Sequence, residues 1–229
     1  MALVANALTT VATLAAELGI ATPAASSAAE ADLERRIAVA SSAIEKYCGR
    51  TFARATVTEQ VPGYGTQNLR LSRAPVLSVT SVELDGEPVP VEDYRTPSGT
   101  SAQAGFLERA KGTWEWTALE SKSPAPEPLA GTERPLYEVV YVGGYVLPKD
   151  EVLPGTPRTL PYEVEEACLA TCVAIYRAKG RDKSIISESV LSASVTYAGS
   201  TANTAIGRGA GGIIPDDVLP LLAPYRMTL

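Results

Sequence analysis

One stretch of the sequence constrains the fold more than any other, because it predicts a helix that needs neighbours on every side. Residues 161–179 begin with a proline, which suits a first helical position, and Gly180 suits the end of a helix. Three glutamates lie in the first turns and two basic residues in the last, so both signs match the helix dipole. Between them, Ala167–Tyr176 carries no charge and is too short to span a bilayer. We therefore predict that this helix is the centre of the core.

Two further helices are expected before it. Apolar residues at 4-3-4-3 spacing predict an amphipathic helix that packs on the central one; they are Leu33, Ile37, Ala40, Ile44 and Tyr47. Ser26 or Ser27 can cap its start, and Gly49 can end it. A helical pattern also runs through the N-terminus to Gly19, in Val4, Leu8, Val11, Ala15 and Leu18. Both helices have one apolar face, so both should pack on the core.

Between the helices the apolar period changes to two, which predicts strands. We expect a hairpin of 56–61 and 68–71, a second hairpin of 76–84 and 89–94 around Asp85-Gly86, and strands at 106–109, 114–117, 136–142 and 190–197. The stretches 120–135 and 148–159 are expected to be loops. Val218, Leu221, Leu222 and Tyr225 predict a short last helix, which Pro220 kinks or shortens.

This order of elements predicts an α+β fold, in which a small helical bundle surrounds the central helix (161–179) and carries a β-strand and hairpin insertion. We expect one domain over residues 1–229. Its helical core would comprise 1–53 and 160–182, its β insertion 56–147, and its C-terminal arm and short helix 198–229.

The composition leaves little room for catalysis. The chain has no histidine, which removes the commonest general base and metal ligand. The three cysteines lack the spacing of a zinc site or a disulfide scaffold. Glu163, Glu165 and Glu166 could bind a divalent cation, but the helix dipole already explains them. The net charge of −6 argues against a surface that grips nucleic acid. We therefore expect no enzyme activity, no cofactor and no metal.

Several motifs, in order, resemble a known family. They are Tyr47-Cys-Gly-Arg-Thr-Phe52, Arg73-Ala-Pro75 with the strand that follows to Asp85-Gly86, the strand 137–145 ending in Gly-Gly-Tyr, the Leu160-Pro161 helix with Tyr176-Arg177, and the terminal Pro224-Tyr-Arg226. Together they resemble the head–tail connectors of tailed bacteriophages, the adaptor or head-completion proteins below the portal. The loops 120–135 and 148–159 look longer than is usual in that family.

The resemblance implies a structural subunit of a ring of twelve copies. Its partners would be the portal protein, a tail-side stopper or neck protein, and further copies of itself. DNA would pass through the lumen without specific binding, and no membrane would be involved. The protein would reside at the head–tail interface of the virion, after assembly in the host cytoplasm.

Two sets of residues are candidates for interfaces. Those for the portal are Arg208, Ile213, Ile214, Val218, Leu221, Leu222, Tyr225 and Arg226; those for the ring or the tail side are Trp114 and Trp116. The alternative for the first set is that the last helix simply covers the core, and Trp114 and Trp116 could equally be core residues. Alternative functions are another neck component such as a stopper, a monomeric binding module with an aromatic face, and an enzyme that uses carboxylates alone.

Overall fold

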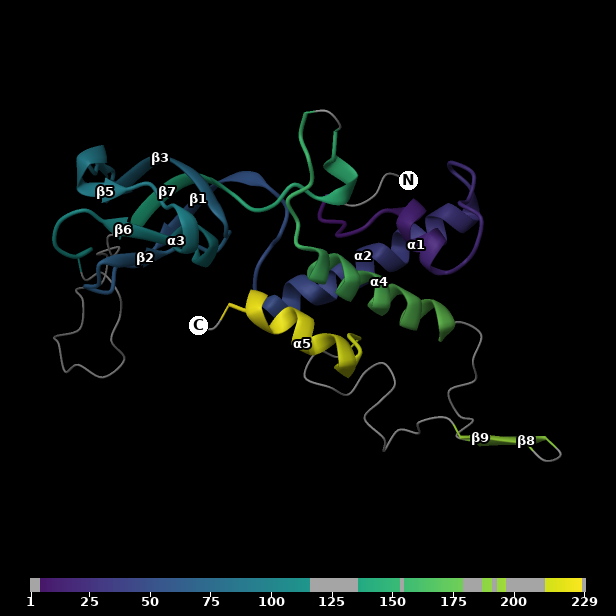
Figure 1. Ribbon diagram of the computed structural model, residues 1–229. Helices are drawn as coiled ribbons and strands as arrows, with labels where there is room; N and C mark the ends of the chain where they lie inside the picture. The colour runs from purple at the N-terminus through teal and green to yellow at the C-terminus, as the bar shows by residue number, and fades with distance from the viewer. Residues whose placement is uncertain are drawn as a thin grey trace, which may run out of the picture. The chain divides into compact units, whose positions relative to one another are not determined.

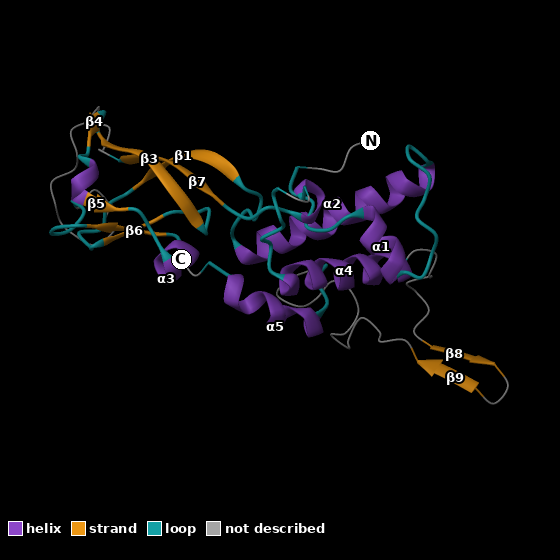
Figure 2. Cartoon of the chain, turned by 45° about the horizontal axis from the view of Figure 1, so that its top comes forward, coloured by secondary structure: helices purple, strands orange, loops and turns teal. Residues whose placement is uncertain are grey.

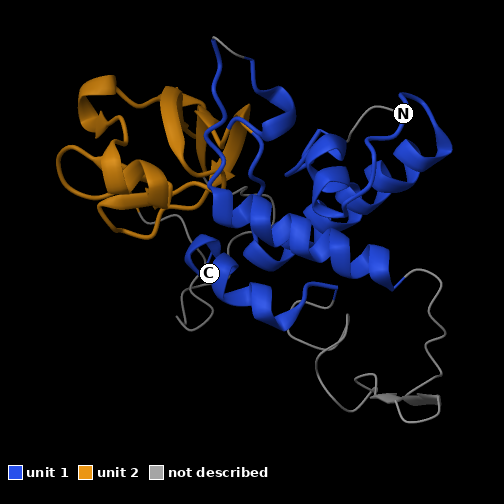
Figure 3. Cartoon of the chain, turned by 45° about the vertical axis from the view of Figure 1, so that its right-hand side comes forward, with its two compact units in different colours: residues 1–53, 146–229 blue, residues 54–145 orange. Residues whose placement is uncertain are grey.

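The computed structural model in Figure 1 describes residues 5–115, 136–152, 155–178, 187–190, 193–196 and 213–227. The chain divides into two compact units: one comprises Met1–Ala53 and Val146–Leu229, and the other Arg54–Tyr145 (Figure 3). We call them the helical unit and the β unit. Helices and antiparallel sheets are thus combined in one chain, and the predicted α+β class is confirmed.

The helical unit is built around α4 (Tyr162–Arg177). This helix packs against α1 (Val11–Glu17), α2 (Ala28–Cys48) and α5 (Leu219–Leu222), which reach it from both ends of the sequence (Figure 2). No residue of Ala167–Tyr176 is exposed, as expected for a central helix. The helix begins at Tyr162, one residue later than predicted. Pro161 is its N-cap and not its first helical residue, because the ψ of Pro161 is 140°.

Local signals explain where α2 begins and ends. The Ser27 hydroxyl accepts a hydrogen bond from the Glu30 amide at 3.1 Å, and Gly49 takes the left-handed conformation at φ 66°. On the predicted apolar face, Leu33, Ile37, Ala40 and Ile44 are fully buried and Tyr47 is half-buried. Both the N-cap and the buried face are those that the sequence predicted, so the predicted helix is confirmed.

The buried side chain of Arg36 on α2 also forms hydrogen bonds that link α2 to α4. The Arg36 guanidinium donates to both Asp32 carboxylate oxygens, at 3.0–3.2 Å, and to the Ile175 carbonyl at 3.0 Å. It also lies 5.2 Å from the centre of the Tyr176 ring. A buried guanidinium is tolerated here because its donors meet a carboxylate and one of the free carbonyls at the end of α4.

The N-terminal helix is shorter than predicted. It begins at Val11 because the Thr10 hydroxyl caps it, accepting a hydrogen bond from the Thr13 amide at 3.2 Å. Residues 5–10 are turns and bends, and Val4 lies outside the described residues. Leu8 is nevertheless buried, and its amide donates to the Ser41 hydroxyl on α2 at 3.1 Å. The apolar pattern therefore identified buried residues but overestimated the helix.

The β unit contains two antiparallel sheets. The larger has the order β1-β7-β3-β4 and is formed by Ala55–Val61, Tyr137–Gly143, Val76–Leu84 and Glu87–Pro88. The smaller has the order β2-β6-β5 and is formed by Asn68–Arg70, Phe106–Arg109 and Tyr94–Arg95. A short helix, α3 (Gly99–Ala104), and a 3₁₀ turn, η1 (Val91–Asp93), complete the unit.

The predicted hairpin of 56–61 and 68–71 is wrong, because β1 pairs with β7 and β2 pairs with β6. The intervening Pro-Gly-Tyr-Gly segment looked like a tight turn. Instead, Gly63 lies against another part of the chain, where an added Cβ would fall 2.0 Å from the Glu115 carbonyl oxygen. The glycine therefore serves a close tertiary approach that local sequence does not reveal.

The Asp85-Gly86 hairpin is confirmed, and both turn residues have positive φ, at 54° and 81°. Its second strand is only Glu87–Pro88, because Tyr94–Arg95 joins the other sheet. The predicted strand at 114–117 is not formed in its described part, Trp114 and Glu115.

A further hairpin lies outside both of these sheets. β8 (Ser187–Val190) and β9 (Ala193–Thr196) pair with each other in a two-stranded sheet. A single strand was predicted at 190–197. The prediction located the second arm of the hairpin and missed the first.

The core of the β unit is aromatic. Trp114 packs edge-on against Tyr137, with ring centroids 5.0 Å apart, and donates from Nε1 to the Leu107 carbonyl at 3.2 Å. Tyr141 donates to the Glu59 carboxylate at 2.6 Å and accepts from the Arg73 amide at 3.0 Å. Burial, followed by the bond to Glu59, raises the pKa of Tyr141 to about 12. These bonds hold the Arg73 segment against β7.

A substitution at Gly143 tests how closely the backbone at Arg73 approaches β7. A Cβ at this position would lie 2.1 Å from the Arg73 carbonyl oxygen, so Gly143→Ala should displace backbone and cost about 1–3 kcal/mol or more. Gly86→Ala is the control, because nothing lies within 4 Å of an added Cβ and only the φ of 81° opposes the change, at about 1 kcal/mol. Urea unfolding of both variants measures the difference, and equal losses would contradict the close approach.

The three cysteines, Cys48, Cys168 and Cys172, are free and buried. Burial raises the pKa of Cys48 to about 11, which further lowers its reactivity. We expect a thiol reagent such as Ellman's reagent to leave the native protein unmodified at pH 8 and to label all three thiols in guanidinium chloride. Labelling of the native protein at the unfolded rate would contradict this burial.

Candidate interaction surface

The C-terminal segment 213–227 divides into a buried and an exposed side. Ile214, Val218 and Leu222 recur every four residues and are at most 3% exposed. They belong to a segment that packs on α4 through α5 and the 3₁₀ turn η3 (Asp216–Val218). On the other side, Ile213 and Leu221 are 38% and 37% exposed.

This division corrects three predicted portal contacts. Ile214, Val218 and Leu222 are core residues of the helical unit and are not available as anchors on its surface. The alternative, that the last helix covers the core, therefore holds for these three. Ile213, Leu221 and Arg226 remain exposed, and Tyr225 is half-buried. Arg208 lies outside the described residues.

The end of the chain docks on the end of α2. The Met227 amide donates to the Cys48 carbonyl at 2.8 Å, which satisfies one of the free carbonyls at the helix end. Arg226 lies over the Tyr47 ring at 5.2 Å, and the Tyr225 and Phe52 rings meet edge to face at 6.4 Å. Two motifs nearly 180 residues apart in the sequence thus form one cluster.

The first turn of α4 borders this cluster. The Tyr225 hydroxyl donates to the Glu163 carboxylate at 3.3 Å. The adjacent Tyr162 is 73% exposed, and the Arg158 guanidinium lies 4.2 Å from its ring centre. The Arg50 guanidinium lies 5.2 Å from the centre of the buried Phe52 ring. We call this region the aromatic–arginine surface; it comprises Tyr47, Arg50, Arg158, Tyr162, Tyr225 and Arg226. Tyrosine and arginine are the residues that most often dominate binding energy at protein interfaces.

A buried ion pair supports this surface from below. The Arg158 guanidinium contacts the Glu165 carboxylate and donates to the Leu160 carbonyl at 3.2 Å. Thr9 donates its hydroxyl proton to Glu165 at 3.2 Å. The sequence explained Glu165 as a complement to the helix dipole, with a cation ligand as the alternative; the structure buries it as the partner of Arg158. The ion pair ties the loop before α4 to the helix itself.

The tryptophan candidates do not form a surface in the described residues. Trp114 is fully buried in the β unit, so of its two predicted roles, core residue or interface residue, the structure supports the core. Trp116 lies outside the described residues. A binding module that uses Trp114 on an exposed aromatic face is therefore inconsistent with the structure.

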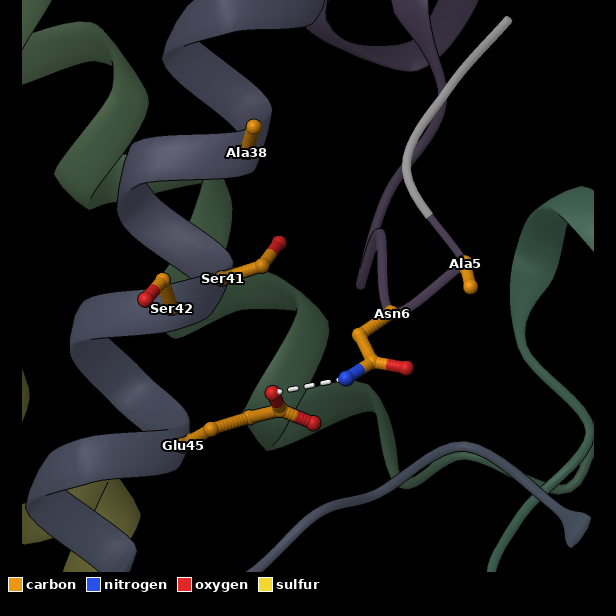
Figure 4. A pocket seen from close by; sticks show the side chains of 6 residues that line it. All are labelled: Ala5, Asn6, Ala38, Ser41, Ser42 and Glu45. Atoms are coloured by element: carbon orange, nitrogen blue, oxygen red, sulfur yellow. Dashed lines mark hydrogen bonds between the residues drawn. The ribbon is translucent and has the colours of Figure 1, made fainter.

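An open pocket also lies in the helical unit, between one face of α2 and the N-terminal segment (Figure 4). Ala5, Asn6, Ala38, Ser41, Ser42 and Glu45 line it. Its one charged side chain is already engaged, because Glu45 accepts hydrogen bonds from the Asn6 side chain and the Phe52 amide, both at 3.1 Å. The lining offers no pair of groups for acid–base chemistry.

Two features are absent from the part of the chain that the structure describes. There, no three side chains of Asp, Glu, Cys or His gather in a group that could hold a metal ion. Among the same residues, no helix combines the length and the apolar character needed to cross a membrane.

Comparison with protein-family models and with curated proteins gives no match. Solved structures do match, over the whole of this chain. A chain in the neck of an empty gene transfer agent (GTA) particle, computed with C6 symmetry, has a TM-score of 0.54 at 17% identity, with 94% of its length covered. A chain in the neck of the native particle, computed with C12 symmetry, gives 0.53 at 15% and 93%. A third, from the virion of the native GTA particle, gives 0.52 at 18% and 94%.

At this level of identity the likeness concerns the fold. It extends from one end of the chain to the other, so it includes both the helical unit and the β unit. The resemblance to head–tail connectors that the ordered motifs indicated is thereby confirmed at the level of the fold.

Removing the charge of Glu165, which lies beneath the aromatic–arginine surface, should destabilise the protein. Glu165→Gln leaves the Arg158 guanidinium largely buried without its counter-charge, and we expect a loss of about 3 kcal/mol in the free energy of unfolding. Glu166→Gln is the matched control on the next, exposed position and should change it by less than about 0.5 kcal/mol. Denaturant unfolding compares the two variants, and a Glu165→Gln protein as stable as the control would show that the pair contributes little.

Proposed function

We propose that this protein is a structural head–tail adaptor subunit of a tailed phage or phage-like particle. Copies of the chain form a ring of twelve below the portal, extend the channel for DNA and bind the proteins on the tail side. The protein acts by assembly and performs no catalysis. It resides at the head–tail interface of the virion, and its assembly takes place in the host cytoplasm.

One observation carries this proposal: the fold matches, over the full chain, chains from the neck of a GTA particle. One of these necks was computed with C12 symmetry, which is the copy number expected for the ring. The ordered motifs give independent support, because they were matched to connectors from sequence alone.

The exposed side of the C-terminal segment is the proposed contact with the portal. Ile213 and Leu221 supply apolar area, Arg226 supplies a charge that is already stacked on an aromatic ring, and Tyr162 extends the surface onto α4. Apolar and aromatic anchors beside an arginine are typical of the centre of a protein interface. Arg208 remains a proposed contact on the same arm.

The charge of the chain suits a DNA channel. With 26 acidic and 20 basic residues, the subunit repels phosphate more than it attracts it. An acidic wall allows DNA to slide, whereas a basic wall would hold it. DNA therefore passes the ring without specific binding.

Another position in the neck, such as that of a stopper, is the second candidate. The matching structures support it equally at the level of the fold, since they are chains from the necks of GTA particles. Binding to the portal distinguishes the two, because a stopper would bind the adaptor and not the portal.

The mass of the protein, alone and with its cognate portal, tests the proposal. For the protein without the portal, native mass spectrometry should give either a 24.0 kDa monomer or a ring. With the portal, it should give a complex that carries about twelve additional subunit masses. A protein that stays monomeric and does not bind the portal would contradict the adaptor role.

Leu221→Ser then tests the proposed portal contact. Leu221 is exposed, so the variant should fold like the wild type yet bind the portal at least about fivefold more weakly, as expected for loss of an interface anchor worth more than about 1 kcal/mol. Val39→Ser, at the same 37% exposure on α2, is the control and should bind normally. Equal affinities would place the portal contact elsewhere.

A further inference from the structure

The larger sheet of the β unit has one edge that lacks the usual protection. β1 pairs along all seven residues with β7, in an unbroken register, and with no other strand among the described residues. It contains no proline and no basic residue. Its one charged residue, Glu59, is engaged within the unit by the Tyr141 hydroxyl and the Ser72 amide. A regular edge of this kind is a template for pairing with another strand.

The other strands at or near sheet edges are protected. β4 has two residues and includes Pro88, and β2 and β5 have three and two residues. β3 carries two register shifts, at Val76/Ser78 and Val79/Ser81. Short strands, proline and bulges are the devices by which proteins prevent edge pairing. The contrast within one molecule indicates that the β1 edge is left open for a partner.

Among the described residues, the β1 edge lacks a neighbour and the hairpin β8–β9 lacks a third strand. Its strands form a sheet of two, with four residues paired on each side. An isolated two-stranded hairpin is at best marginally stable in water and needs a third strand or a packing partner. Its strands, Ser-Glu-Ser-Val and Ala-Ser-Val-Thr, also contain no proline and no basic residue. The hairpin is therefore suited to be added to an existing sheet.

We propose that the β8–β9 hairpin of one copy adds to the β1 edge of the next copy and extends its four-stranded sheet. Each copy carries one donor hairpin and one acceptor edge, so the contact is head-to-tail and repeats until a ring closes. Main-chain hydrogen bonds along β1 supply the affinity, as in other cases of strand addition. The proposal rests on the ring assembly proposed above and identifies what joins its subunits.

Disulfide cross-linking between copies tests this pairing. One batch of protein carries a single new cysteine on β1, as Thr56→Cys, Thr58→Cys or Gln60→Cys, whose side chains are exposed on one face of the sheet. A second batch, with a different tag, carries a single new cysteine at one position of β8 (Ser187–Val190) or β9 (Ala193–Thr196), each position being tried in turn. Rings are assembled from the mixture on the portal and mildly oxidised. The native thiols are buried and should not contribute.

We expect at least one combination to give a cross-linked dimer that contains both tags, since opposed residues on paired strands come within disulfide range. Thr80→Cys is the control, because it is equally exposed but lies on β3, two strands away from β1. Rings in which no β1 combination cross-links, or in which Thr80→Cys cross-links as well, would overturn the proposal. The two tags exclude a bond within one chain.

Replacing 187–196 with a Gly/Ser segment of equal length separates this inference from the proposed function. We expect the variant to keep the thermal unfolding profile of the wild type but to lose the multi-copy ring on the portal. If the wild type forms the ring and the variant forms it equally well, strand addition is wrong and the adaptor function stands. If the wild type itself forms no ring, both proposals fail.

Discussion

The structure depends on covering a helix that has no side suited to water. Ala167–Tyr176 contains no charge, and every residue of it is at least half-buried in the described chain. A single partner helix covers only one stripe, so several are needed. α1, α2 and α5 provide them, and they come from both ends of the chain. The helical unit is therefore formed from two stretches of the chain that are separated in the sequence by the β unit.

The motifs that indicated the family prove to hold the fold together. Tyr47, Cys48 and Phe52 receive the end of the chain, through an arginine stacked on a ring, a backbone hydrogen bond and an aromatic pair. The Gly-Gly-Tyr motif places Gly143 against the Arg73 carbonyl, and the Arg73 amide donates to Tyr141. These residues therefore maintain contacts between segments that are distant in the sequence.

The residues proposed to bind partners are of a different kind. Ile213, Leu221 and Tyr162 are exposed and stabilise little within one subunit, and the β1 edge needs only its backbone. Sequence patterns identify side chains that repeat with a helix or strand, and exposed anchors need not repeat. The apolar pattern of the last helix therefore grouped Leu221 with Val218 and Leu222, although the first is exposed and the others are buried.

Local sequence determined the parts of the fold that depend on local energy. The cap at Ser27, the stop at Gly49, the Asp85-Gly86 turn and the uncharged run of α4 were all correctly predicted, because hydrogen bonds and dihedral preferences within a few residues decide them. Tertiary structure alone decided that β1 pairs with β7, that Trp114 is a core residue and that Glu165 is buried with Arg158. β1 and β7 are far apart in the sequence, so no local window contains both strands. Arg158 and Glu165 are only seven residues apart, but it is the packing of the helical unit that buries Glu165 beside Arg158.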